Sequence, residues 1–368
     1  MKTNYIKSLD GIRFLAVSMV LFDHWSGDRL GFPASYLGVC MFFVLSGFLI
    51  TRILLSAKEK DADLKRGHGF SLKRFYIRRT IRIFPIYYLT LAILFLLNVE
   101  PVRSKIGWLV TYMSNNYIAI SDNWLGSVDH LWSLAVEEQF YLFFPFLILL
   151  LPLKNIQKSL AFLILLSVLL RVYFYVSGAS WIRPYVLMPT CLDAFGLGGL
   201  LGYGVYYQKE KLINFFSKTS TLLIGTAVYV LTVIWLQAVS EGHNYVSIIF
   251  LRLAESIISV AVLGYLVCRS NTSRGVLHSI FEWEPLVYIG RISYGIYIYH
   301  NFIYNAYHSS PNNPFVKVSN KITAALSDGF AGTSVKILFL YISVILIATV
   351  SWFLIEKPIN KLKSRYGY

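Results

Sequence analysis

An arginine and a histidine lie eleven residues apart in the first apolar segment of this chain, LDGIRFLAVSMVLFDHW. Because an α-helix turns once in about 3.6 residues, Arg13 and His24 are expected on one helix face, roughly 16 Å apart. A central arginine in a membrane helix costs about 2.5 to 3.5 kcal/mol on insertion scales, and such residues are usually functional. The spacing therefore predicts a polar stripe along a membrane helix, with a cation at one end and a base at the other.

Three later segments hold further side chains suited to chemistry. Arg79 and Arg82, in RRTIRIFPIYY, share a helix face, and their guanidinium groups suit a phosphate. The adjacent Glu137 and Glu138, in SLAVEEQFY, point about 100° apart, so at least one is expected to meet a cation. His300, in ISYGIYIYH, is expected in the outward half of a later helix. The plainer alternatives are a topology anchor for the arginines, structural pairing for the glutamates and a core position for the histidine.

The composition predicts an integral membrane protein. Of 368 residues, 56% are hydrophobic and 14% charged, and the mean hydropathy is +0.57, so most of the surface is expected to face lipid. We predict an all-α, polytopic fold with about ten transmembrane helices in a single membrane domain over residues 1–368. The predicted spans lie near residues 9–26, 36–56, 83–99, 131–152, 159–177, 186–207, 219–239, 246–268, 286–307 and 335–355.

The net charge of +15 is concentrated in alternate loops. This asymmetry predicts a multi-pass protein of the plasma (inner) membrane with both termini cytoplasmic, and it makes a nucleic-acid partner unnecessary. Asp10 and Arg13 interrupt the first segment, which is therefore expected to remain as a helix rather than to be cleaved as a signal. Cys40, Cys191 and Cys268 are scattered through apolar spans, so neither a disulfide framework nor a metal site is predicted.

Six motifs, in order, resemble those of the acyltransferase-3 membrane enzymes, which O-acylate carbohydrates: LDGIRFLAV…DHW, GVCMFFVLSGFL, RRTIRIFPIYY, LWSLAVEEQFY, ISYGIYIYH and FLIEKP. The resemblance covers nearly the whole chain. It implies a ten-helix core that takes an acyl group, usually acetyl, from cytoplasmic acyl-coenzyme A and delivers it to a hydroxyl, commonly at the outer face. By position it implies functional roles for Arg13 and His24, for Arg79 and Arg82, and for Glu137.

Cys40 stands where the family often has an acidic residue. A transient acyl carrier is therefore an alternative role for Cys40, although a membrane-buried thiol normally has low reactivity. The family also often carries an appended soluble hydrolase-like domain. Because this chain ends soon after its last predicted helix, any second chemical step is expected to come from another protein.

The predicted helix directions complete a mechanistic hypothesis. The first helix runs outward and the fourth runs back, so His24 and Glu137 are both expected near the outer side and in contact. The phosphates of the donor, acetyl-CoA, are expected on Arg79 and Arg82, with its long arm passing Arg13. His24 is predicted to be the general base, oriented by Glu137. The alternative is that His24 attacks the thioester and forms an acyl-histidine.

The acceptor is expected to be a carbohydrate or a lipid-linked glycan, with membrane lipid as the other partner and no metal. Trp132, on the outer side, suits stacking on a sugar ring or anchoring at the membrane interface. The residues expected to bind substrate or support the site are Asp10, Asp23, Ser46, Trp132, Glu138 and His300.

A secondary transporter or flippase is the alternative function, because the same buried ionisable residues suit a proton relay. Many transporters have repeated halves with matching helix breaks, and this sequence shows no such symmetry. A purely structural membrane protein would leave the buried charges unexplained. The sequence therefore favours the enzyme.

Overall fold

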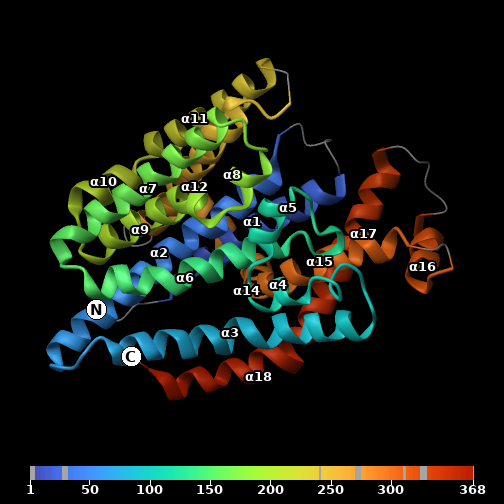
Figure 1. Cartoon of the computed structure of the whole chain (residues 1–368), viewed down its shortest axis with the longest axis horizontal. Coiled ribbons are helices and arrows are strands. Elements are labelled where there is room, and N and C mark those ends of the chain that lie inside the picture. The colour runs from blue at the N-terminus through green and yellow to red at the C-terminus, as the bar shows by residue number, and fades with distance from the viewer. Residues whose placement is uncertain are drawn as a thin grey trace.

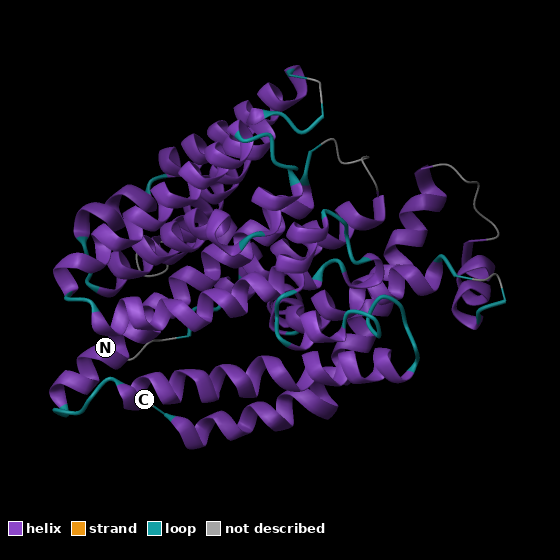
Figure 2. Ribbon diagram, viewed as in Figure 1, coloured by secondary structure: helices purple, strands orange, loops and turns teal. Residues whose placement is uncertain are grey.

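The structure is a computed structural model and describes residues 5–26, 32–239, 242–269, 275–309, 312–323 and 330–367. In these ranges every regular element is a helix (Figure 2), which confirms the all-α prediction.

Seven helical segments in the described chain are long and apolar enough to cross a membrane. Four of them match predicted spans closely: α6 (Leu131–Leu150), α7 (Leu153–Val176), α11 (Thr219–Ala238), and η4 with α12 (Val246–Leu251 and Arg252–Arg269). Two are longer than predicted, because polar helical turns extend them: α2 (Ala34–Asp63) and α3 (Gly69–Leu96). The seventh runs through α17, η5, α18 and η6: Phe330–Ser351, Trp352–Glu356, Lys357–Asn360 and Lys361–Tyr366.

Three of the ten predicted spans are not among these seven segments. The first, α1 (Ser8–Ser26), is one continuous helix that carries several charged residues. The span predicted over 186–207 is divided into α8 (Ile182–Val186), η3 (Met188–Cys191) and α9 (Leu192–Tyr206). Pro184 and Pro189 lie at this division, and proline has no N–H to continue a helix.

The span predicted over 286–307 is also divided, into α14 (Glu284–Arg291) and α15 (Ser293–Tyr307). The backbone leaves the helical region at Ile292, where ψ is 7°. Just before this point α14 packs closely on α1: a Cβ at Gly290 would lie 1.8 Å from the carbonyl oxygen of Asp10. Continuous helices over 186–207 and 286–307 are therefore not formed.

The helix α2 is at the centre of the packing and contacts α1, α6, α9 and α12 (Figure 1). Its contact with α9 depends on glycine on both sides. A Cβ at Gly198 would lie 2.0 Å from the carbonyl oxygen of Val44, and one at Gly47 would lie 2.1 Å from that of Phe195. Small residues let membrane helices approach in this way.

The helix α3 runs along one edge of the molecule, beside α18 and η6 (Figure 1). Because α3 begins at Gly69, Arg79 and Arg82 lie inside the helix rather than in a loop before it. Arg78 Nη1 donates a hydrogen bond to the carbonyl oxygen of Lys363 (3.0 Å), which holds η6 against α3. The remaining short helices are α4 (Ile106–Val110), α5 (Ser114–Ser121), η2 (Gly126–Val128), α10 (Glu210–Ser217), α13 (Val276–Phe281) and α16 (Pro314–Thr323).

Candidate active site

Two adjacent cavities contain most of the predicted site residues. The first, here called the arginine cavity, is lined by residues that include Arg13, Ser46, Arg79, Arg82, Glu137, Glu138 and Tyr141. The second, the histidine cavity, has a volume of about 520 Å³ and is lined by residues that include His24, Trp124, Asp129, His130, Trp132 and Asn301. Val39 and Tyr297 line both cavities, so the two meet at these side chains.

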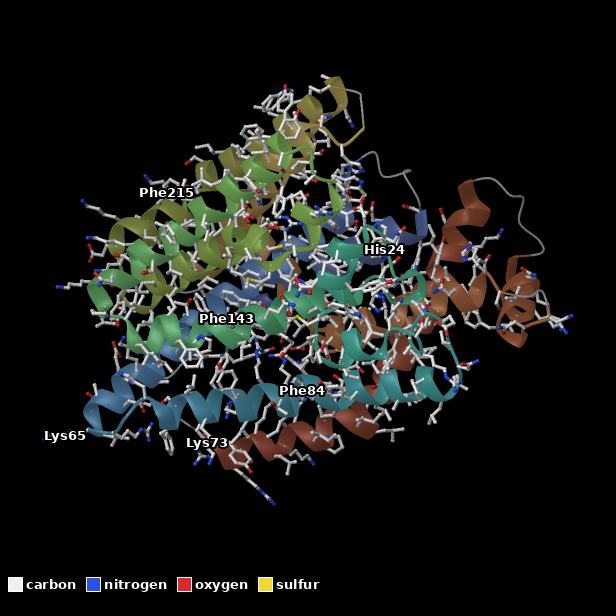
Figure 3. All side chains as sticks on the ribbon, in the orientation of Figure 1. His24, Lys65, Lys73, Phe84, Phe143 and Phe215 are labelled. Atoms are coloured by element: carbon white, nitrogen blue, oxygen red, sulfur yellow. The ribbon has the colours of Figure 1, made fainter. Side chains whose placement is uncertain are left out.

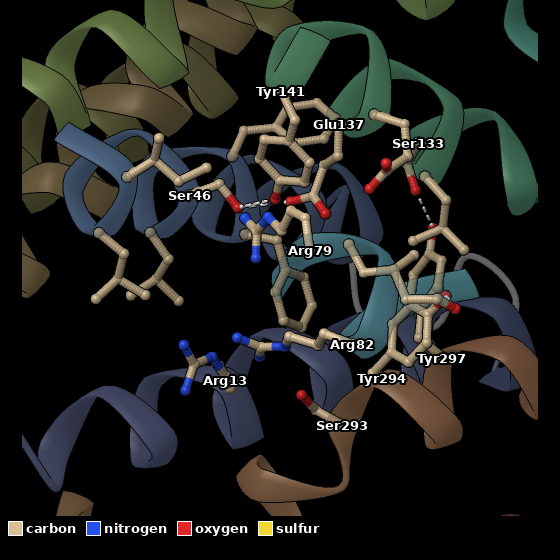
Figure 4. A pocket seen from close by; sticks show the side chains of 18 of the residues that line it. Arg13, Ser46, Arg79, Arg82, Ser133, Glu137, Tyr141, Ser293, Tyr294 and Tyr297 are labelled. Carbon is tan, nitrogen blue, oxygen red and sulfur yellow. Dashed lines mark hydrogen bonds between the residues drawn. The ribbon is translucent and has the colours of Figure 1, made fainter. Parts of the chain in front are cut away.

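The arginine cavity brings together side chains from five helices: α1, α2, α3, α6 and α15 (Figure 4). On α1, Arg13 forms an ion pair with Asp10, which lies one turn earlier. On α3, Arg79 and Arg82 form no ion pair with any carboxylate in the part of the chain that the structure describes, and Arg82 is exposed to the cavity. Guanidinium groups that lack a carboxylate partner in a largely apolar setting suit an anionic ligand.

Glu137 lies on the opposite wall, on α6. Ser46 Oγ donates a hydrogen bond to Glu137 Oε1 (2.8 Å) and also bonds the Tyr141 hydroxyl (2.8 Å) (Figure 4). Arg79 lies over the ring of Tyr141, 3.8 Å from its centroid. Glu138 Oε1 is buried and has no hydrogen-bond partner within the described part of the chain. Glu137 and Arg79 thus lie on one wall, linked through Ser46 and Tyr141 rather than by an ion pair, so the expectation that one of the two glutamates meets a cation stays a prediction.

A third cavity of about 250 Å³, the basic cavity, adjoins the arginine cavity. Arg79 and Arg82 line both of them. The basic cavity is completed by three more cations: Lys60, Arg78 and Lys363. The sequence placed Arg78 beside Arg79, and the three guanidiniums of Arg78, Arg79 and Arg82 together suit a phosphate. Lys60 and Lys363 counted only as topology signals, and their distance along the chain gave no indication that they would meet the arginines. The cluster suits a ligand with several phosphates.

In the histidine cavity, the exposed side chain of His24 has a defined hydrogen-bond pattern. His24 Nδ1 lies 3.1 Å from His300 Nε2, and His300 Nδ1 lies 2.5 Å from the carbonyl oxygen of Tyr297. A carbonyl only accepts, so His300 Nδ1 donates and its Nε2 accepts from His24 Nδ1. Neutral His24 therefore has no hydrogen on Nε2, which is the atom that can act as a base.

The predicted contact between His24 and Glu137 is wrong, because His24 bonds His300 and Glu137 bonds Ser46. Glu137 lies about two helical turns into α6 and faces α2 and α3. His24 lies in the last turn of α1, and α1 is in contact with α15. It is far from Lys65 and Lys73 (Figure 3). The orienting partner predicted to be Glu137 is instead His300.

Two more residues of the histidine cavity were missed as site residues. His130 Nε2 donates to the carbonyl oxygen of Ile298 (3.1 Å), and His130 Nδ1 accepts from the side-chain amide of Asn301 (3.1 Å). Asp129 lies in the loop before α6, and burial raises its pKa to about 6. The sequence could have indicated His130 as a site residue, because it directly precedes the LWSLAVEEQFY motif.

The other predicted supporting residues hold the walls of the histidine cavity. Asp23 Oδ2 accepts a hydrogen bond from the backbone N–H of Ser35 (3.0 Å), which joins the end of α1 to the start of α2. Trp132 lines the cavity and packs on Tyr185, with ring centroids 4.8 Å apart. Cys40 is buried, bonds Ser256 Oγ (3.1 Å) and is not among the residues that line either cavity.

Comparisons with known proteins identify the family of the chain. A family described as an acyltransferase domain matches residues 6–356. The peptidoglycan O-acetyltransferase OatA of Listeria monocytogenes is 31% identical over 80% of this chain and 49% of its own length. A putative O-acetyltransferase of Staphylococcus aureus is 30% identical over 84% of the chain and 52% of its own length. The putative peptidoglycan O-acetyltransferase YrhL of Bacillus subtilis is 28% identical over 97% of the chain and 55% of its own length.

The chain thus spans about half the length of the curated relatives it matches. No solved structure matches it.

Proposed function

This chain belongs to the acyltransferase-3 family, and from that premise we propose that it is a membrane O-acetyltransferase that moves acetyl from acetyl-CoA to a hydroxyl of a glycan. The names of the relatives favour peptidoglycan as the acceptor class. The observation that carries the proposal is the meeting of two unlike cavities at Val39 and Tyr297. The arginine cavity offers Arg79 and Arg82, which pair with no carboxylate in the described ranges, and the histidine cavity offers an exposed histidine whose Nε2 carries no hydrogen.

The arginine and basic cavities are the proposed donor site. Phosphate groups of acetyl-CoA are bound by the cations of the basic cavity, and Arg79 and Arg82 extend the cationic lining inward. The concentration of basic side chains at this end supports a cytoplasmic position for it, because cytoplasmic loops carry an excess of Lys and Arg. The histidine cavity then opens toward the outer side of the plasma membrane, and both termini are cytoplasmic.

His24 is the proposed general base. Its Nε2 takes the proton from the acceptor hydroxyl, and the oxygen attacks the thioester carbonyl carbon. The carbon–sulfur bond breaks, and the coenzyme A thiolate takes the proton back from His24. His300 holds the reactive tautomer by accepting from His24 Nδ1, and the same bond persists when His24 is an imidazolium. Base catalysis of this kind contributes about 10²- to 10⁴-fold.

The test follows radiolabelled acetyl from acetyl-CoA, added to inverted membrane vesicles, into glycan and lipid fractions. We expect incorporation by the wild type and a loss of about 10²- to 10⁴-fold in His24→Ala. His308→Ala is the matched control, because His308 is exposed and is not among the residues lining the histidine cavity. An active His24→Ala protein would contradict the proposal. Label retained on purified enzyme without acceptor would favour an acyl-histidine over direct transfer.

A further inference from the structure

A fourth cavity, here called the Glu255 cavity, lies beside the histidine cavity and takes no part in the transfer step described above. Its volume is about 330 Å³, within the roughly 300–1,000 Å³ of small-molecule sites. Its lining includes Trp181, His243 and Glu255. Tyr36 and Tyr185 line both this cavity and the histidine cavity, so the two are adjacent.

Aromatic side chains form a row from one cavity into the other. Tyr185 is central, with ring centroids 4.8 Å from Trp132, 4.6 Å from Tyr36 and 5.8 Å from Trp181. Trp181 in turn stacks on His243, at 3.7 Å. Such rings combine a flat apolar face with a polar edge. A pyranose ring has the complementary form, with C–H groups on its faces and hydroxyl groups at its rim.

Glu255 supplies an unused hydrogen-bond acceptor in this cavity. Its side chain lines the cavity, the residue is only 2% exposed, and Oε1 has no hydrogen-bond partner among the residues that the structure describes. Arg252, one turn earlier on α12, donates instead to the carbonyl oxygen of Tyr185 (2.8 Å). Arg171, which also lines the cavity, pairs with Asp193 (2.8 Å). A buried carboxylate without a partner is costly, so this position favours a ligand that donates hydrogen bonds.

The cations of the lining already have partners in the protein, which favours an uncharged ligand. Arg171 pairs with Asp193, and Arg252 donates to Cys191 Sγ and to the carbonyl oxygen of Tyr185. We propose that the Glu255 cavity binds a second sugar unit of the glycan acceptor, next to the unit that receives acetyl at His24. The aromatic row stacks on the sugar ring, and Glu255 accepts hydrogen bonds from its hydroxyl groups. This assignment rests on the proposed function of the histidine cavity.

The test measures binding to the full chain in lipid nanodiscs, with N-acetylglucosamine and its β-1,4-linked tetramer as probes. Glu255→Gln preserves the size of the side chain and removes the charged acceptor. We expect the Kd of the tetramer to rise about tenfold, since a hydrogen bond to a charged group contributes about that much. Acetyl transfer to the monomer and the KM for acetyl-CoA are expected to stay unchanged. Trp181→Leu, which removes the stacking ring, is expected to weaken tetramer binding in the same way.

Glu210→Gln, which changes an exposed carboxylate on α10, is the matched control. The binding assay needs no acetyl-CoA and therefore also works with His24→Ala. A wild-type chain that binds the tetramer but transfers no acetyl would contradict the proposed function, while sugar binding in the Glu255 cavity would still hold. Equal tetramer affinity in the wild type, Glu255→Gln and Trp181→Leu would overturn it, as would an absence of tetramer binding by the wild type.

Discussion

The reactive atom of the proposed site is set by a chain of hydrogen bonds that ends on a backbone carbonyl. Tyr297 accepts from His300, His300 accepts from His24, and His24 Nε2 is left as a base facing the histidine cavity. A histidine partner orients the base but adds no negative charge, unlike the carboxylate predicted from the sequence. His300 is therefore a positioning residue, and its contribution should depend on its ability to accept a hydrogen bond.

Two substitutions of His300 distinguish a positioning role from a packing role. We expect His300→Leu to lower kcat by about 10²-fold or more, since the base then loses its fixed tautomer, with the KM for acetyl-CoA unchanged. His300→Gln should retain much more activity, because its amide oxygen can accept from His24 Nδ1. Steady-state kinetics on both variants measure this difference. Equal losses in the two would assign His300 to packing alone.

At the scale of helices, the site depends on how closely α2 approaches its neighbours. Ser46 on α2 reaches Glu137 on α6, and Val39 on α2 stands where the arginine and histidine cavities meet. The position of α2 is set on its other side by α9, through the backbone contacts at Gly47 and Gly198. Added volume at this interface should therefore both destabilise the fold and displace one wall of the site.

Gly198→Ala tests that dependence. Its Cβ would lie 2.0 Å from the carbonyl oxygen of Val44, and a backbone atom cannot move aside as a flexible side chain can. Overpacking of this kind costs about 1–3 kcal/mol, so we expect a lower melting temperature in detergent and reduced activity. Gly67→Ala is the control, because a Cβ there meets nothing within 4 Å. Identical melting curves for the two variants would contradict the close contact between α2 and α9.

At the scale of the whole molecule, the third helix and the last helical segment together line the proposed donor site. The last helical segment returns along α3, where Arg78 bonds the carbonyl oxygens of Lys363 (3.0 Å) and Tyr366 (3.2 Å). This places the Lys363 side chain among the cations of the basic cavity. The arginine and histidine cavities share walls from α1, α2, α6 and α15 and meet at Val39 and Tyr297, whereas α3 lines the arginine cavity and α8 lines the histidine cavity.

Lys363→Gln should raise the KM for acetyl-CoA by about tenfold and leave kcat unchanged, since a charge-assisted contact to phosphate is lost in the ground and transition states alike. Kinetics at varied acetyl-CoA concentration provide the measurement. Lys361→Gln, an exposed lysine not among the residues lining the basic cavity, is the matched control. An unchanged KM in Lys363→Gln would remove the basic cavity from the donor site.

The sequence alone was sufficient to predict the features that depend only on residues close together along the chain. Composition predicted a helical membrane protein, and helical spacing placed Arg79 and Arg82 on one face, where both line the arginine cavity. The motifs also identified His24 and His300. These predictions hold because a helix repeats every 3.6 residues whatever surrounds it.

Contacts between helices could not be predicted from the sequence. Periodicity says which side chains share a face, but helix rotation, breaks and depth decide which neighbour that face meets. Glu137 was therefore assigned to His24 although it bonds Ser46, and Glu255 gave no signal until the packing of α8 and α12 placed it beside Tyr185. The partner of each charge is a non-local property, set by the close packing of the whole helix assembly.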